Sequence, residues 1–248
     1  MTVFTASRPL VFAHRGGSAL GPENTIAAFD RGMAAGADGL ELDVHLSADG
    51  VVVVHHDETL DRTTNDSGPL AARTALQLSR VDAGEGQGIP QLAEVLHRFP
   101  DIPIIIELKV NTPAMGEAVV RVVRDARAVD RVCLGGFGGR SVAAARALLP
   151  GIPTGASQHE VRMALYRSWI GWRMSRPPYG GFQVPETAQG HRIVSPRFIR
   201  FAHRSGLKVQ VWTVDEEADM RRLLGWGVDA LISNRPDLAV RVRDELFA

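Results

Sequence analysis

The stretch that decides the fold is GADGLELDVHLSADGVVVVHH, residues 36–56. Within it, Leu40–Val44 is a predicted β-strand, and Asp49-Gly50 is a dipeptide typical of two-residue hairpin turns. The run Val51–His55 should therefore return antiparallel to the strand that precedes the turn. An antiparallel arm has no place in a closed ring of parallel strands, so in a parallel barrel this run would be the return arm of a hairpin outside the ring.

On both sides of this hairpin, strand-sized apolar runs alternate with helical segments, which indicates parallel β/α units with both sheet faces covered. Besides the strand at 40–44, the predicted strands are Leu10–Ala13, Ile102–Leu108, Arg131–Phe137, Pro153–Ala156, Gly181–Val184, Val209–Val214 and Ala230–Ser233. Helical spacing is found in Asn24–Ala35, Met115–Arg127, Ser141–Leu148, Pro196–Ser205 and Glu216–Gly225. Eight strands in β/α units predict an α/β protein with the TIM (β/α)8 barrel fold, which we favour over a doubly wound open sheet.

The alternation of strands and helices breaks between Leu60 and Leu92, where Gly68-Pro69 and a glycine-rich patch occur. We expect an insertion there, at about residues 58–92, between the second and third barrel strands and placed where it could cap the barrel mouth. The whole chain, residues 1–248, is then a single TIM-barrel domain.

Composition excludes several classes of protein. Lys plus Arg and Asp plus Glu are equal at 28 each, so a general nucleic-acid footprint is not expected. Cys133 is the only cysteine, which rules out an intrachain disulfide. Met1–Pro9 lacks the charged and apolar segments of a secretory signal, and the longest apolar runs are shorter than a membrane span. We therefore expect a soluble, cytoplasmic protein.

Three acidic residues lie near the ends of two predicted barrel strands. Glu41 and Asp43 are two residues apart, so they project from the same face of their strand, and Glu107 is on the next barrel strand. Carboxylates this close repel one another unless a positive charge lies between them. One hard divalent cation, Mg²⁺ or Ca²⁺, is the natural partner of such a cluster. The alternative is that these acids form ion pairs with Arg15 and Lys109.

Two histidines are candidates for the same site. His14 directly follows a predicted strand and precedes a pair of glycines, which would let a substrate approach the backbone closely. A two-residue turn would set His56 opposite Asp43 and His55 opposite Val44, so His56 should share the face of the acidic cluster. The remaining histidines we interpret as surface or packing residues, namely His45, His97, His159, His191 and His203.

Two imidazoles beside a metal ion are suited to moving protons to and from the oxygens of a phosphodiester. The metal and nearby cations would stabilise negative charge on the phosphoryl oxygens. Arg15 and Lys109 are the candidate phosphate contacts, although Arg15 could equally be a structural partner of Glu41.

These motifs resemble the glycerophosphodiester phosphodiesterase family, TIM-barrel enzymes related to phosphatidylinositol-specific phospholipases C. The resemblance extends from about Leu10 to Asp237 and departs from the family pattern at Asn234, where an aspartate is common, and at His55. The stretch Pro150–Gly190 matches poorly. The matching segments are HRGGSALGPENT (14–25), GADGLELDVHLSADGVVVVHHDETLDRTT (36–64), IIIELK (104–109), VQVWTVDEE (209–217) and GVDALISNRPD (227–237).

The resemblance implies a role for each candidate residue. It implies acid/base catalysis by His14 and His56, metal binding by Glu41, Asp43 and Glu107, phosphate binding by Arg15 and Lys109, and an aromatic site wall at Trp212. A tryptophan that packs inside the barrel is an equally sound interpretation of Trp212. The insertion matches a small extra subdomain of the family.

The function implied is metal-dependent hydrolysis of a small-molecule glycerophosphodiester to glycerol 3-phosphate and an alcohol, by way of a cyclic phosphate. One alternative is a lysophospholipase D-like enzyme with a lipid substrate, and another is a catalytically silent binding barrel. A long apolar groove at the mouth would favour the lipid, and a tight polar pocket would favour the soluble diester.

One further segment carries a hypothesis about membranes. Tyr166–Tyr179 (YRSWIGWRMSRPPY) contains two tryptophans and three arginines, a combination that can dock on an anionic lipid surface. The alternative is that the segment packs on the flank of the barrel, and burial of both Trp169 and Trp172 would exclude docking.

Overall fold

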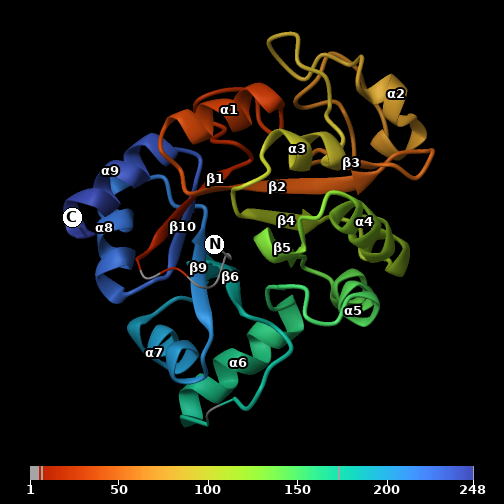
Figure 1. Ribbon diagram of the computed structural model, residues 1–248. Helices are drawn as coiled ribbons and strands as arrows, with labels where there is room; N and C mark the ends of the chain where they lie inside the picture. The colour runs from red at the N-terminus through yellow and green to blue at the C-terminus, as the bar shows by residue number, and fades with distance from the viewer. Residues whose placement is uncertain (1–5, 7, 173, 248) are drawn as a thin grey trace.

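The computed structural model describes residue 6, residues 8–172 and residues 174–247 (Figure 1). Most of the N-terminal stretch 1–9 and Arg173 lie outside the described residues. The strands are β1 (Leu10–His14), β2 (Gly39–Leu46), β3 (Val52–Val54), β4 (Ile104–Leu108), β5 (Val132–Gly135), β6 (Gly181–Pro185), β7 (Thr187–Ala188), β8 (His191–Arg192), β9 (Lys208–Trp212) and β10 (Ala230–Ser233). The helices are α1 (Ile26–Ala34), α2 (Ala75–Leu78), α3 (Leu92–Arg98), α4 (Pro113–Asp125), α5 (Gly139–Leu148), α6 (Gln158–Ile170), α7 (Pro196–Arg204), α8 (Glu217–Trp226) and α9 (Pro236–Phe247), with 3-10 turns η1 (Leu70–Ala72) and η2 (Val129–Arg131).

The main sheet is a ring of parallel strands. Its hydrogen-bonded order is β5-β4-β2-β1-β10-β9-β6, and every neighbouring pair along this path is parallel. The segment 153–156 joins the two ends of the path, because Leu134 of β5 pairs with Thr154 and Gly155 pairs with Gly181 of β6. The predicted strand at Pro153–Ala156 thus closes the ring. The TIM barrel is confirmed, and the open doubly wound sheet is excluded.

Helices surround the ring, as Figure 1 shows. Each barrel strand is followed in the chain by one longer helix, from α1 after β1 to α9 after β10. Polar caps start several of them: Thr25 accepts a hydrogen bond from the backbone of Ala28, and Thr112 precedes Pro113 at the first turn of α4. The five predicted helices are present, whereas α3, α6 and α9 were not predicted.

Strand alternation separates the core from the site. Leu40, Leu42 and Val44 of β2 face outward into a large core cluster with the helices. The inward face carries a smaller cluster that includes Phe12 of β1 and Ile105 of β4. Because side chains alternate along a strand, the inward face continues toward the carboxyl ends with His14 on β1, Glu41 and Asp43 on β2, and Glu107 on β4.

The β2–β3 hairpin is present, but its predicted register is wrong by one residue. β3 pairs antiparallel with β2 outside the ring, with Val44 opposite Val54. The turn is a three-residue loop closed by Ser47 and Val51, with Gly50 in the left-handed region at φ 76°. The Asp49 carboxylate accepts hydrogen bonds from the Ser47 hydroxyl and from the backbone of Ala75 in the insertion, which stabilises this longer loop.

The predicted pairing of His56 with Asp43 is therefore incorrect. The backbone N–H of His55 donates to the carbonyl of Asp43 instead, at 3.0 Å, and the ladder ends there.

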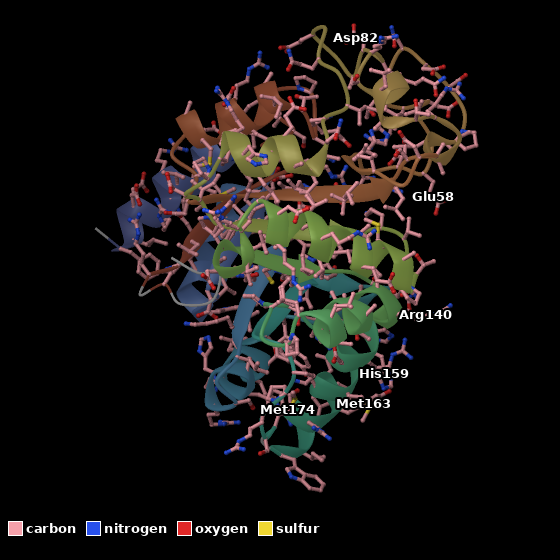
Figure 2. All side chains as sticks on the ribbon, turned by 45° about the vertical axis from the view of Figure 1, so that its right-hand side comes forward. Glu58, Asp82, Arg140, His159, Met163 and Met174 are labelled. Atoms are coloured by element: carbon pink, nitrogen blue, oxygen red, sulfur yellow. The ribbon has the colours of Figure 1, made fainter. Side chains whose placement is uncertain are left out.

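The segment after the hairpin has a small apolar cluster of its own. It contains η1 and α2, and its buried side chains include Leu60, Leu70, Leu78 and Ile89, packed with Val53 of β3. In Figure 2, Asp82 lies in this region at the top of the view and Glu58 lies below it at the right-hand edge, while Met163 and Met174 lie in the lower part. Within the described residues, no helix has the length and apolar character needed to cross a membrane.

Candidate active site

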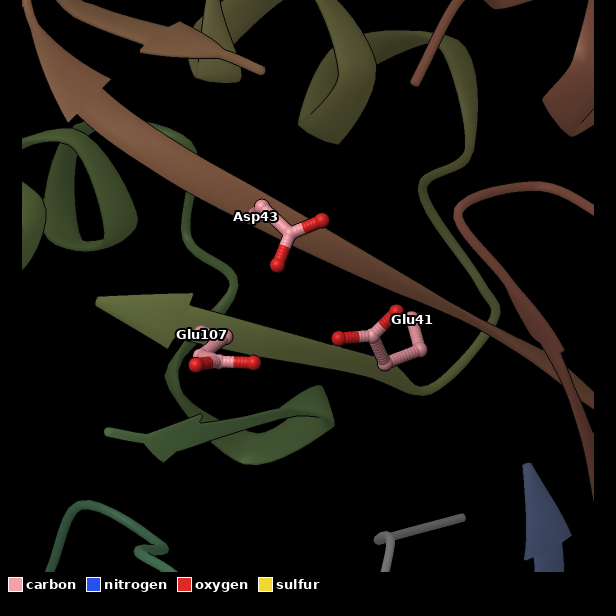
Figure 3. A group of neighbouring side chains, drawn as sticks. All are labelled: Glu41, Asp43 and Glu107. Carbon is pink, nitrogen blue, oxygen red and sulfur yellow. The ribbon is translucent and has the colours of Figure 1, made fainter. Parts of the chain in front are cut away.

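Three carboxylates meet at the mouth of the barrel. The register of β2 and β4 sets Asp43 beside Glu107, and the register of β1 and β2 sets His14 beside Glu41. One carboxylate oxygen from each of Glu41, Asp43 and Glu107 lies within 4.8 Å of the others. Figure 3 shows the three groups directed toward one another from β2 and β4. Glu41 and Asp43 are 5% and 1% exposed, so solvent screens their repulsion poorly.

The electrostatics of the cluster fit a divalent cation. Burial raises the pKa of Glu41 well above its usual range, and the neighbouring carboxyls of Asp43 and Glu107 add to the rise. Burial also raises the pKa of Glu107, although Lys109 opposes this. A cation binds carboxylate oxygens at about 2.0–2.6 Å, so two ligands across the ion are up to about 5 Å apart. The spacing of these oxygens is compatible with Mg²⁺ or Ca²⁺.

Two basic side chains compensate part of this negative charge. Nζ of Lys109 lies 3.4 Å from both Asp43 and Glu107. Nε of Arg15 lies 3.3 Å from Asp43, and its Nη1 lies 3.0 Å from Glu23. The predicted partnership of Arg15 with Glu41 exists only through the Arg15 backbone N–H, which donates to the Glu41 carboxylate at 3.2 Å. The expected alternative of ion pairs is therefore present for Asp43 and Glu107, and phosphate contact stays a prediction for these two cations, which also line the central cavity.

His14 is held in a defined orientation. Its Nδ1 lies 2.7 Å from Oδ1 of Asn234, whose Nδ2 donates to Asp215 at 2.7 Å. Because the amide nitrogen is engaged with Asp215, the amide oxygen faces the imidazole and Nδ1 carries the proton. Nε2 then has a free lone pair, 3.8 Å from Glu41. Burial, with a smaller contribution from Arg15, lowers the pKa of His14, which favours the neutral ring at neutral pH.

His56 reaches the same cavity by a route that differs from the predicted one. The chain leaves the ladder after Val54, and the backbone carbonyl of His56 accepts a hydrogen bond from His45. Nδ1 of His56 pairs with the Asp57 carboxylate. His55 is buried instead, with its Nε2 bonded to the carbonyl of Thr59.

An ionic network supports His56 from the insertion. Arg62 donates to both Asp57 and Glu23, and Glu23 in turn pairs with Arg15. Hydrogen bonds from Arg62 lower the pKa of Asp57. Burial opposes ionisation of Glu23, but contacts with Arg62 and Arg15 outweigh it and lower its pKa. The carboxylates of this network are therefore charged, and they tie the insertion to the loop after β1.

A single cavity of about 540 Å³ joins these groups. Of the eight predicted site residues, seven line it, and the buried Asp43 does not. The seven are His14, Arg15, Glu41, His56, Glu107, Lys109 and Trp212. Trp212 contacts Phe137 edge to face at a centroid distance of 5.8 Å, and it both lines the cavity and packs against the apolar cluster inside the ring, so its location fits both interpretations.

The structure adds information on two other residues near the site. Gly16 has φ +86°, and a Cβ there would lie 2.8 Å from atoms of Ala28 and Phe29, so packing against α1 by itself requires a glycine at this position. His191 is exposed on β8, as expected of a surface residue, and it also lines the cavity.

Several residues of the site were not singled out by sequence reasoning. Asn24, buried with φ 59°, donates to Asp43 at 2.9 Å. Asp215, Asp57, Arg62 and Glu23 orient other groups, as described above. All five lie within the segments that match the family, which was the only sign in the sequence that they belong to the site. A matching segment does not show which contacts its polar residues make.

The segment Tyr166–Tyr179 does not pack its tryptophans on the barrel flank. Trp169 and Trp172 are 67% and 71% exposed, so the alternative of flank packing is wrong for both side chains. The segment begins within α6, whose C-cap is Gly171 with φ 72°. Docking on lipid stays a prediction.

Comparisons with known proteins agree with the barrel fold and indicate a family. The model of the Glycerophosphoryl diester phosphodiesterase family matches residues 14–238. A glycerophosphodiester phosphodiesterase of Caldanaerobacter subterraneus is 33% identical over 251 residues, which cover 95% of this chain and 98% of the relative. The crystal structure of a glycerophosphodiester phosphodiesterase from Agrobacterium tumefaciens is 29% identical and has a TM-score of 0.77, covering 93% of this chain and 99% of that one. A phosphodiesterase of Oleispira antarctica, solved in complex with the product sn-glycerol-3-phosphate, is 25% identical with a TM-score of 0.81, covering 96% and 97%.

Proposed function

The chain belongs to the glycerophosphoryl diester phosphodiesterase family, and on this premise we propose that it hydrolyses glycerophosphodiesters to glycerol 3-phosphate and an alcohol. One observation carries the proposal: three carboxylates and two imidazoles converge on one cavity, with Lys109 and Arg15 beside them. The alternative, in which these charged residues only form structural ion pairs, would not explain why two imidazoles line the same cavity. This set matches what phosphodiester hydrolysis requires.

Glu41, Asp43 and Glu107 would hold one divalent cation, Mg²⁺ or Ca²⁺. When bound, it supplies positive charge that stabilises the phosphoryl oxygens as negative charge develops on them. Lys109, now 3.4 Å from two of the carboxylates, would then have its charge available for the phosphate. Arg15, which also lines the cavity, is the second phosphate contact.

The two imidazoles divide the proton transfers. His14 has Nδ1 held by Asn234, so its Nε2 accepts the proton of the attacking hydroxyl. His56, with Nδ1 held by the Asp57 carboxylate, donates a proton from Nε2 to the departing alcohol oxygen. The attacking group is the glycerol hydroxyl next to the phosphate. The resulting cyclic phosphate is opened by water, with the roles of the imidazoles reversed.

The test is an assay of purified protein against glycerophosphocholine and glycerophosphoethanolamine, with Mg²⁺ and Ca²⁺ supplied separately. We expect release of glycerol 3-phosphate together with choline or ethanolamine. Glu41→Gln should abolish the release, while Glu94→Gln on the outer helix α3 serves as the matched control and retains it. Equal activity of the two variants would refute the proposed site. Binding without turnover would support a silent barrel instead.

A further inference from the structure

Inside the ring, the cavity reaches an amide side chain that the proposed mechanism does not use. Gln183 of β6 lines the cavity and is half-buried, and its partner in the sheet register is the fully buried Gln210 of β9. The cluster inside the ring is otherwise apolar and includes Phe12 and Ile105. A buried amide is unfavourable among apolar side chains unless its hydrogen-bonding groups have partners. The partners of Gln183 therefore indicate what this residue does.

Hydrogen bonds fix the orientation of this amide. Nε2 of Gln183 donates to Oε1 of Gln210 at 3.0 Å and to Sγ of Cys133 at 3.4 Å. Both hydrogens of the amide nitrogen are therefore engaged, and Oε1 of Gln183 is the group that remains. Among the residues that the structure describes, no N–H or O–H group donates a hydrogen bond to this oxygen. Its lone pairs are available to a hydrogen-bond donor of the substrate.

The amide of Gln183 spans two levels of the barrel interior. Its nitrogen contacts Cys133, which pairs in register with Ile105 of the apolar cluster. Its oxygen lies at the next level, because a Cβ at Gly135 would be only 2.8 Å from this oxygen, and Gly135 pairs in register with Glu107. Neighbouring strands are about 4.8 Å apart. The oxygen therefore lies about one strand spacing from the strand that carries Glu107 of the acidic cluster.

The surroundings of this oxygen leave it open to the substrate. Gly135 and Gly155 have no side chains, and the oxygen fills the space that a Cβ at either position would occupy. Gly135 also lines the cavity. In the proposed mechanism the departing alcohol points toward His56, which follows β3 of the hairpin outside the ring. The glycerol group, a few bonds from phosphorus on the other side, is then the part of the substrate that faces the interior.

We propose that Oε1 of Gln183 accepts a hydrogen bond from the terminal hydroxyl of the glycerol group and thereby selects diesters in which this hydroxyl is free. This inference rests on the proposed function, which it makes more specific. The hydroxyl next to the phosphate is the attacking group, so the terminal hydroxyl is the only other donor on the glycerol. An amide oxygen only accepts, and a methyl group or an ester oxygen at that carbon has no proton to donate. The substrate that fits is a glycerophosphodiester with an unmodified glycerol.

The test compares glycerophosphocholine with 2-hydroxypropyl phosphocholine, with the divalent ion present. The analogue keeps the attacking hydroxyl and has hydrogen in place of the terminal one. We expect kcat/KM of the wild type to be about tenfold lower for the analogue, because the hydrogen bond to Gln183 is lost. An analogue hydrolysed as well as glycerophosphocholine, or better, would overturn the inference while leaving the proposed function intact. Hydrolysis of neither compound would count against the proposed function itself.

Variants assign the discrimination to Gln183. Gln183→Leu and Gln183→Met lack the acceptor, so the ratio of kcat/KM for glycerophosphocholine to that for the analogue should fall from about ten to about one. Both rates come from one preparation, so this ratio does not depend on the fraction of folded protein. Gln158→Leu is the matched control, since Gln158 lines the same cavity but is exposed at the start of α6, and it should keep the wild-type ratio.

Two outcomes would show that Gln183 does not bind this hydroxyl. One is a wild-type ratio in both Gln183 variants, and the other is a ratio that Gln158→Leu lowers as far as they do.

Discussion

Nδ1 of His14 lies 2.7 Å from Oδ1 of Asn234, although the two residues are 220 positions apart in the sequence. The Asn234 side-chain amide cannot rotate freely, because its Nδ2 donates to the Asp215 carboxylate and its Oδ1 accepts a hydrogen bond from the Ser18 hydroxyl. The contact therefore fixes which nitrogen of His14 carries the proton. Nε2 of His14 is then the basic nitrogen that faces the cavity. Because the partner of Nδ1 is a neutral amide and not a carboxylate, this hydrogen bond adds no negative charge beside the imidazole.

This relationship predicts the behaviour of variants at Asn234. Asn234→Leu removes the acceptor and should lower kcat by about 10- to 100-fold, with a smaller change in KM, because the ring loses its orientation. Asn234→Asp keeps an oxygen acceptor and should retain more activity than Asn234→Leu. Steady-state kinetics on glycerophosphocholine measures both. Wild-type kcat in Asn234→Leu would show that this hydrogen bond does not position His14.

The two imidazoles should each be required. His14→Ala and His56→Ala should lower kcat by about two to four orders of magnitude while the thermal midpoint stays close to that of the wild type. His97→Ala on the outer helix α3 is the control and should keep full activity. If His56→Ala turns over normally, the acid has been assigned to the wrong residue, and the buried His55 becomes the next residue to replace.

The acidic cluster should destabilise the metal-free protein in a pH-dependent way. Folding raises the pKa of Glu41 and Glu107, so these groups favour the fold below their unfolded pKa near 4.5, and this contribution is lost as the pH rises. Glu41→Gln removes the charge. It should raise the thermal midpoint in excess chelator at pH 7.5 by a few degrees, on the order of 1 kcal/mol, and by little at pH 4.5.

Thermal unfolding at the two pH values measures this difference. The wild type should gain more from added Mg²⁺ or Ca²⁺ at pH 7.5 than at pH 4.5, because more carboxylates are ionised. An identical midpoint for Glu41→Gln and the wild type in chelator at both pH values would mean that the carboxylates do not repel one another as the structure indicates.

The surface around the end of α6 should bind anionic lipid. Ile170 and Trp172 are 70% and 71% exposed there, and residues 158–206 contain eight arginines against two acidic residues in a chain of zero net charge. We expect binding to vesicles that contain anionic phospholipid and little to zwitterionic ones, with weakening by salt and by Trp172→Ser. Leu76→Ser, which removes an exposed leucine of the insertion, is the control. Sedimentation with vesicles that carries down both variants equally would refute the predicted contact.

Much of the ring and of the acidic cluster could be predicted because both follow from strand geometry. Side chains alternate between the two faces of a strand, so Glu41 and Asp43, which are two residues apart, project from the same face whatever the position of the strand in the sheet. The register of the hairpin was wrong for a different reason. Loop length at Asp49 depends on contacts with Ser47 and with Ala75, which belongs to a separate part of the chain. The dipeptide Asp49-Gly50 alone gives no information about contacts with residues outside the turn.

Two other features were beyond pattern reasoning. α6 was missed because the residues that it buries, Ala164 and Ser168, are small or polar, while its large side chains Tyr166 and Trp169 are exposed, so the sequence lacks the simple apolar stripe of a surface helix. The hydrogen bond between Asn234 and His14 joins residues near opposite ends of the chain.

The prediction that His56 lies at the cavity is correct, although the argument for it was wrong, since the chain turns after Val54 instead of continuing the ladder.

The central claim is that the carboxylates of Glu41, Asp43 and Glu107 hold one divalent cation with which His14 and His56 hydrolyse a phosphodiester. The most direct measurement is the rate of glycerol 3-phosphate release from glycerophosphocholine by purified protein, first in excess chelator and then after one divalent ion is restored. We predict no detectable release in chelator, and recovery with Mg²⁺ or Ca²⁺ in the wild type but not in Asp43→Asn. Full activity in excess chelator would contradict the claim.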